Sequence, residues 1–93
     1  MLTKHTQLKY LNRRLDEMAS LEDLLEQKNF PEASRLARLV RGSAPSLRFE
    51  GLAELAARLE NACRFAPEPV RGHETRAAFV RYRQLAGDLR DSF

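Results

Sequence analysis

The first thirty residues contain neither glycine nor proline, and large apolar side chains recur along them at spacings of three and four. The residues of this stripe are Leu8, Leu11, Leu15, Met18, Leu21, Leu24 and Leu25. Such spacing places side chains on one face of an α-helix, which turns once every 3.6 residues. The pattern predicts one long amphipathic helix over residues 3–27. The sequence "SLED", which begins at Ser20, resembles a local capping box and is compatible with a break there.

A second helix is predicted to begin after Asn29, a good N-cap residue, with Pro31 in its first turn. Its apolar face consists of Ala33, Leu36, Ala37, Val40 and Ala44. Steps of 100° per residue place Arg38 almost opposite this face. Pro45 is expected to end or kink the helix, because proline cannot continue the backbone hydrogen-bond ladder.

Two more helices follow the same pattern. The third has a predicted buried stripe of Leu52, Leu55 and Leu59 with Ala62 or Cys63. Its predicted outward residues are Glu54, Arg58, Glu60 and Asn61. The segment "RFAPEPVRG" contains two prolines and a glycine and predicts a loop. The fourth helix is therefore expected to start near Gly72 or His73. It is expected to bury Ala78, Phe79, Tyr82, Leu85 and Leu89.

Four amphipathic helices with short connections bury their apolar faces most simply against one another. The predicted fold class is therefore all-α, an antiparallel up-and-down four-helix bundle that forms a single domain over residues 1–93. Cys63 is the only cysteine, so an intrachain disulfide is excluded and the thiol is expected in the core. No stretch has the apolar length of a signal peptide or a membrane span, so the protein is predicted to be soluble and cytoplasmic.

The middle of the chain, "LARLVRGSAPSLRFEGLAELAARLENA", resembles the signature of the histidine phosphotransfer (HPt) domains of bacterial phosphorelays. In that family a helix carries a pattern close to A-H-x-L-K-G-S-A, and the next helix reads like L-x-x-L-A-x-x-L-E. Here "RGSA" at residues 41–44 matches K-G-S-A, and Ala37 matches the alanine before the histidine. The resemblance implies an HPt-like bundle. It also implies two partners, the receiver domain of a response regulator and a sensor histidine kinase.

The resemblance places the phosphoacceptor histidine of the family at Arg38. A guanidinium stays protonated and offers no free lone pair, whereas a neutral imidazole does. The sequence therefore predicts a chain without catalytic activity, a pseudo-HPt protein. His5 and His73 are expected to be surface residues near helix ends. A phosphotransfer activity that uses one of them is the weakest alternative.

Other positions of the motif carry over from the resemblance. Gly42 is expected to leave open space beside Arg38, so that a partner can approach. Arg41 replaces the lysine that the family places near the phosphoryl group and keeps its positive charge. Arg48 replaces the glycine that follows the turn, which adds a cation and is expected to alter that turn. Leu39 is expected to be partly exposed beside them.

These features predict a partner-binding face. Its residues are Arg35, Arg38, Leu39, Arg41, Gly42, Pro45 and Arg48. No acid lies between Glu32 and Glu50, so the arginines are expected to be unpaired and to suit an acidic or phosphorylated surface. The alternatives are a merely solvated helix face, and a structural or assembly bundle outside phosphorelays. Nucleic acid is the weaker partner, because the net charge is only +3 and no recognition motif accompanies the arginines.

The remaining chemistry-bearing residues show no catalytic arrangement. There is no convergent Ser-His-Asp or Cys-His set, no glycine-rich phosphate loop and no HExxH-type metal spacing. The sequence predicts neither a cofactor nor a metal site. The predicted function is a non-catalytic protein that docks on a receiver domain or a histidine kinase and modulates phosphorelay signalling.

Overall fold

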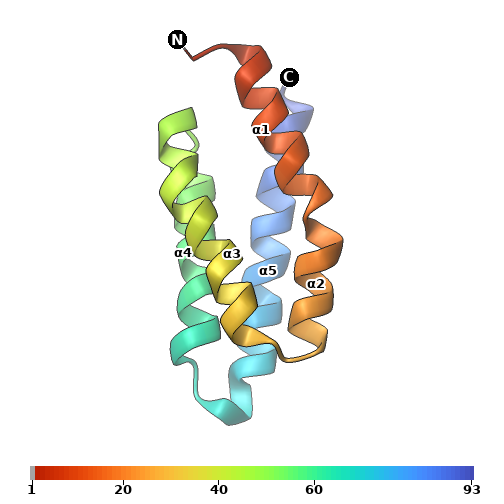
Figure 1. Cartoon of the computed structure of the whole chain (residues 1–93), viewed down its shortest axis with the longest axis vertical. Coiled ribbons are helices and arrows are strands. Elements are labelled where there is room, and N and C mark those ends of the chain that lie inside the picture. Colours follow the sequence, from red (N-terminus) through yellow and green to blue (C-terminus); the bar gives the residue numbers. More distant parts are fainter. Residues whose placement is uncertain (1) are drawn as a thin grey trace.

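The computed structural model describes residues 2–93, so Met1, the first residue of the predicted domain, lies outside the described residues. Within this range the chain forms five α-helices and one 3-10 helix. They are α1 (Lys4–Asp16), α2 (Met18–Glu26), α3 (Phe30–Ser43), η1 (Ala44–Leu47), α4 (Glu50–Phe65) and α5 (Glu68–Asp91). Figure 1 shows that α1 and α2 follow one another as a single arm, and that α3, α4 and α5 then run alternately up and down. The predicted all-α up-and-down four-helix bundle is confirmed.

The predicted single helix over residues 3–27 is wrong, because the first arm is divided at Glu17, between α1 and α2. The division lies three residues before Ser20, where the sequence was compatible with a break. The backbone of Glu17 keeps a helical conformation, and its N–H lies 3.3 Å from the carbonyl of Arg13 and 3.2 Å from that of Arg14. The Arg14 guanidinium also donates to the Glu17 carboxylate over 3.0 Å. At the division the Glu17 N–H is thus shared between the carbonyls three and four residues earlier.

The second arm begins as predicted. The side chain of Asn29 accepts a hydrogen bond from the backbone N–H of Glu32 over 3.4 Å, and Pro31 lies in the first turn of α3. The α-helix ends at Ser43 and Pro45 lies in η1, which confirms that proline interrupts the helix. Both boundaries follow from local chemistry, because a cap satisfies free N–H groups and proline removes one.

The predicted start of the fourth helix near Gly72 or His73 is wrong, because α5 starts at Glu68. Pro69 lies in its first turn, where the backbone N–H has no partner within the helix and proline therefore removes nothing. The connection from α4 is accordingly reduced to Ala66 and Pro67. Prolines that indicated a loop in the sequence instead initiate a helix of 24 residues.

The core lies along the axis of the bundle and is lined by all four arms. Its most completely buried large apolar residues are Leu11, Leu52, Leu59 and Phe79. Tyr82 and Cys63 are also buried, which confirms their predicted place. Burial raises the pKa of the Cys63 thiol to about 11, so the thiol is protonated at neutral pH. Helices α3 and α4 pack side by side, and buried alanines recur along α3, η1 and α4: Ala33, Ala37, Ala44, Ala53 and Ala56.

The passage from η1 to α4 depends on Arg48, whose φ of 66° and ψ of 30° are left-handed. The N–H of Phe49 donates to the carbonyl of Ala44, and the N–H of Arg48 donates to that of Pro45, both over 3.0 Å. This is the hydrogen-bond pattern of a Schellman motif, in which glycine is favoured at the left-handed position. The turn therefore keeps its form with an arginine at a glycine position.

Replacing Arg48 with glycine is expected to raise the free energy of unfolding by up to about 1 kcal/mol, because glycine has no Cβ to strain at positive φ. Chemical denaturation followed by circular dichroism measures the change. Lys28, whose φ is 58°, provides a matched control, since Lys28→Gly relieves similar strain away from the α3–α4 turn. Destabilisation by Arg48→Gly alongside stabilisation by Lys28→Gly would show that the Arg48 side chain stabilises the turn.

Candidate functional site

The predicted partner-binding residues lie together along α3, η1 and the turn that follows. We call this surface the α3 face, and it consists of Arg35, Arg38, Leu39, Arg41, Gly42, Pro45 and Arg48. All seven residues are exposed. Leu39 is 56% exposed, which confirms its predicted exposure. The face thus combines cations with one accessible apolar side chain.

Gly42 lies one helical turn after Arg38 and leaves the surface beside it open. A Cβ built on Gly42 would meet no neighbouring atom within 4 Å. The predicted open space is therefore confirmed. A glycine inside a helix costs about 1 kcal/mol relative to alanine, and packing at this position does not require it. The Arg38 side chain forms no ion pair with any residue of the described range 2–93.

The prediction that the arginines are unpaired is wrong for two of them. Arg35 binds the carboxylate of Glu32, with its Nε 2.8 Å from Oε1. This hydrogen bond lowers the pKa of Glu32 and raises that of Arg35. Arg41 binds Glu60 of α4, with 2.7 Å between its guanidinium nitrogen and Oε1. The error has a simple cause, since one acid lies a turn earlier in α3 and the other lies on a different helix.

Glu60 was predicted to face outward, and this prediction is wrong because its side chain is only 1% exposed. Glu60 directly follows the core residue Leu59 and lies on the side of α4 that meets α3. Helices α3 and α4 pack closely against one another, and the carboxylate of Glu60 is covered where it meets Arg41 of α3. A buried carboxylate requires a cation or hydrogen-bond donors, and Arg41 provides both.

A second arginine, Arg64, lies beside Glu60. Its guanidinium lies 3.6 Å from Oε2 of Glu60, and no residue of the described chain donates a hydrogen bond to that oxygen. Arg64 also lies over the ring of Phe65, 4.9 Å from its centroid. The predicted site did not include Arg64. In the sequence, the only sign of this ion pair is that Arg64 lies four residues after Glu60, on the same side of the helix. Such a spacing is common on solvent-exposed helices, so it indicates a site only once Glu60 is known to be buried.

Helix α1 forms hydrogen bonds to the C-terminal end of α3 and to η1. The hydroxyls of Tyr10 and Ser43 are hydrogen-bonded over 2.7 Å, and Ser43 donates to the carbonyl of Leu39 over 2.9 Å. The Gln7 amide donates to the carbonyl of Leu47 in η1 over 2.9 Å. These bonds fix the C-terminal turn of α3 and η1 against the first arm.

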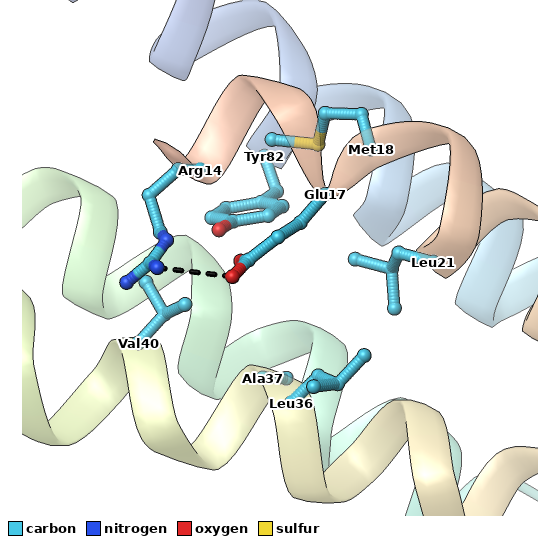
Figure 2. Close-up of a pocket in the computed structure, with 8 residues that line it drawn as sticks. All are labelled: Arg14, Glu17, Met18, Leu21, Leu36, Ala37, Val40 and Tyr82. Atoms are coloured by element: carbon cyan, nitrogen blue, oxygen red, sulfur yellow. Dashed lines mark hydrogen bonds and ion pairs between the residues drawn. The ribbon is translucent and has the colours of Figure 1, made fainter. Parts of the chain in front are cut away.

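Below this contact, Figure 2 shows a small pocket between the first arm, α3 and α5. Its lining residues are Arg14, Glu17, Met18, Leu21, Leu36, Ala37, Val40 and Tyr82. Its cavity volume of about 10 Å³ is no more than the space of one water molecule. Burial raises the pKa of Tyr82, against the opposing effect of the Arg14 charge. The pocket is therefore a packing feature and has no room for a small-molecule ligand.

The two histidines lie away from the α3 face, and both are exposed. His5 lies at the start of α1, as predicted, whereas His73 lies inside α5 because that helix starts earlier than expected. Among residues 2–93, no three His, Cys, Asp or Glu side chains gather into a group that could hold a metal ion. None of the helices in this range is both long and apolar enough to cross a membrane.

The described residues thus form an up-and-down helical bundle that presents one exposed, cationic helix face with open space at a glycine. The family model described as "Hpt domain" matches residues 9–92, which span all four arms of the bundle. The chain therefore belongs to the histidine phosphotransfer family, whose members interact with receiver domains and kinases in phosphorelays. No curated protein and no solved structure matches the chain.

Proposed function

We propose that this chain is an HPt protein without a phosphoacceptor, which acts by docking its α3 face on a receiver domain or a sensor histidine kinase. The resemblance places Arg38 at the position of the phosphorylated histidine. Its guanidinium cannot accept a phosphoryl group at neutral pH, because all its nitrogens are donors. Phosphotransfer is therefore replaced by binding, and the docked protein modulates the relay by occupying the surface that an active HPt domain uses.

The observation that carries this proposal is the accessibility of Arg38 together with the open space at Gly42. Arg38 is exposed and has no ion pair among the described residues, while the position one turn later leaves open space. Leu39 adds an exposed apolar contact beside the cation. An arginine next to an apolar side chain is a favourable combination at the centre of a protein interface.

The proposed mode of docking follows from the chemistry of the partner. A receiver domain carries an acidic pocket with an aspartate and a metal, where active HPt proteins deliver or accept the phosphoryl group. Arg38 reaches toward this pocket and pairs with its carboxylates or with a phosphoryl group there. The docked chain then blocks phosphotransfer or reports the phosphorylation state of the partner.

Arg38→Ala is expected to weaken binding to the partner about tenfold or more, the range of an interface hot spot. Isothermal titration calorimetry against a panel of receivers and kinases measures this change. Arg58→Ala is a matched control, because Arg58 is an exposed arginine of α4 that pairs with the exposed Glu54. If the two substitutions weakened binding equally, the loss of affinity would be explained by the loss of one positive charge. That result would contradict a specific role for Arg38.

Gly42→Leu tests the open space in the same assay. The leucine fills the surface beside Arg38 and is expected to reduce binding about as strongly as Arg38→Ala does. Gly72 in α5 provides the control, since a Cβ there also meets nothing within 4 Å. Unchanged binding by Gly42→Leu would show that the partner docks elsewhere. The absence of binding to every receiver and kinase would favour a structural bundle outside phosphorelays.

A further inference from the structure

A shallow groove runs along the outward side of α5, where this helix packs against α4. It has a volume of about 440 Å³. Its lining residues are Leu55, Val80, Arg81, Gln84, Leu85 and Asp88. Leu55 and Leu85 are half-buried, whereas Val80 is 42% exposed, so the groove offers apolar side chains to a molecule that lies along α5. We call this surface the α5 groove.

The α5 groove contains one cation and one anion that are not paired within the described chain. Arg81 and Asp88 are both exposed, and neither forms an ion pair with any of residues 2–93. Seven residues are about two helical turns, so both side chains lie on the same side of α5, about 10 Å apart along its axis. This separation is too long for an ion pair between them. The Asp88 carboxylate accepts a hydrogen bond from the Gln84 amide over 2.9 Å, and this neutral donor leaves the negative charge uncompensated.

The two charges are complementary to the same two charges on a second copy of the chain. In a two-fold symmetric dimer one surface meets itself, and two equivalent helices that pack across the axis run antiparallel. An axis midway between Arg81 and Asp88 places the Arg81 of each copy opposite the Asp88 of the other, which gives two ion pairs. The same axis brings the exposed Val80 level with the half-buried Leu89 of the other copy. The two surfaces therefore match in both charge and apolar contact.

We propose that two copies of this chain associate along the α5 groove as an antiparallel homodimer. The charges select this arrangement, because a parallel pairing in the same register would place Arg81 against Arg81 and Asp88 against Asp88. Each chain also carries a net charge of +3, which disfavours association without such specific pairs. Because the ion pairs are exposed and the groove is shallow, the dimer is weak and exchanges readily with the monomer.

The α5 groove lies away from the α3 face. Helix α3 packs against α4 and α2, and α5 packs against α4 and both helices of the first arm. The two helices therefore occupy diagonal positions in the bundle, and the groove lies on the side of α5 that meets α4. A dimer formed there leaves the α3 face of each copy accessible. Dimerisation does not depend on docking, so either proposal can fail while the other stands.

Sedimentation equilibrium of the full chain tests the dimer directly. Over protein concentrations from about 10 μM to 1 mM, the average mass is expected to rise toward twice that of the monomer. The expected dissociation constant is on the order of 100 μM. It is expected to rise with ionic strength, since salt screens exposed ion pairs. A chain that stays monomeric up to 1 mM would overturn the proposal and leave the groove to a helix of another protein.

Reversing one charge is expected to break the dimer. Arg81→Glu and Asp88→Arg each place like charges opposite one another twice per dimer, and each is expected to raise the dissociation constant at least about tenfold. Arg90→Glu is the matched control, because it changes the net charge equally and lies nine residues after Arg81, on the opposite side of α5. It is expected to change the constant less than about twofold. No loss in Arg81→Glu, or an equal loss in Arg90→Glu, would overturn the groove as the interface.

Mixing the two weakened variants tests the antiparallel pairing. In a heterodimer of Arg81→Glu with Asp88→Arg, the new glutamate faces the new arginine, and the remaining Asp88 faces the remaining Arg81. Both ion pairs are restored, so the mixture is expected to associate within about threefold of the wild-type dissociation constant. Fluorescence anisotropy of one labelled variant titrated with the other measures this association, and thermal unfolding checks that both variants fold. Folded variants that fail to associate with one another would contradict the antiparallel dimer.

Discussion

The Arg38→His variant is expected to accept a phosphoryl group from a phosphorylated receiver domain, whereas the wild-type chain is expected to remain unphosphorylated. The new imidazole has a nitrogen lone pair at neutral pH. It attacks phosphorus, the bond from phosphorus to the aspartate oxygen breaks, and the carboxylate leaves as the nitrogen–phosphorus bond forms. The surroundings are already suitable, since Gly42 leaves open space and Arg41 offers a cation on the same face.

Transfer of radiolabelled phosphate measures this gain, and stability in alkali with loss in acid identifies the product as phosphohistidine. Arg35→His is the matched control, because it introduces a histidine on the same exposed face at a position that the motif does not single out. Phosphorylation of wild type at His5 or His73 would contradict the proposal of a non-catalytic protein. A variant that binds the receiver but gains no phosphoryl group would show that more than one residue separates this chain from active HPt proteins.

Arg41→Ala is expected to lower the free energy of unfolding by about 2–4 kcal/mol, although the arginine is half-exposed. The cost arises at Glu60, which is fully buried and accepts its only hydrogen bond among the described residues from Arg41. Without it, Arg64 at 3.6 Å is the remaining cation near a desolvated carboxylate. Urea denaturation followed by circular dichroism measures the loss.

Two comparisons isolate the buried charge as the cause. Arg58→Ala removes an exposed ion pair with Glu54 and is expected to change stability by less than about 0.5 kcal/mol. The double variant Arg41→Ala with Glu60→Leu is expected to be more stable than Arg41→Ala alone, because it buries no charge. A loss in Arg41→Ala no larger than that in Arg58→Ala would contradict this account.

Features of the fold that depend on local chemistry could be predicted from the sequence. The repeating apolar side chains predicted the four arms, Asn29 predicted the start of α3, and Pro45 its end. Periodicity placed Arg38, Arg41 and Pro45 away from the core stripe of α3, and the resemblance added Arg48 in the turn that follows. The two errors in helix boundaries arose at short sequences that are compatible with two different local structures. Proline in "APEP" fits a loop as well as a first turn, and "SLED" fits a cap as well as a continuing helix.

The arrangement around Glu60 could not be predicted in this way. Arg41 and Glu60 are 19 residues apart, and their pairing depends on how closely α3 approaches α4. Periodicity assigns a glutamate to the surface unless a neighbouring helix covers it. Arg64 remained outside the predicted site for the same reason, because its significance depends on the buried carboxylate.

The close packing of α3 against α4 also has a mechanical consequence. Close-packed protein interiors have low compressibility and transmit strain. A load applied to α3 by a docked partner is therefore expected to be shared by α4. The first arm is instead divided at Glu17, between α1 and α2, so it consists of two shorter helices. Strain from a partner docked on α3 is therefore expected to pass into α4 before it reaches α1 and α2.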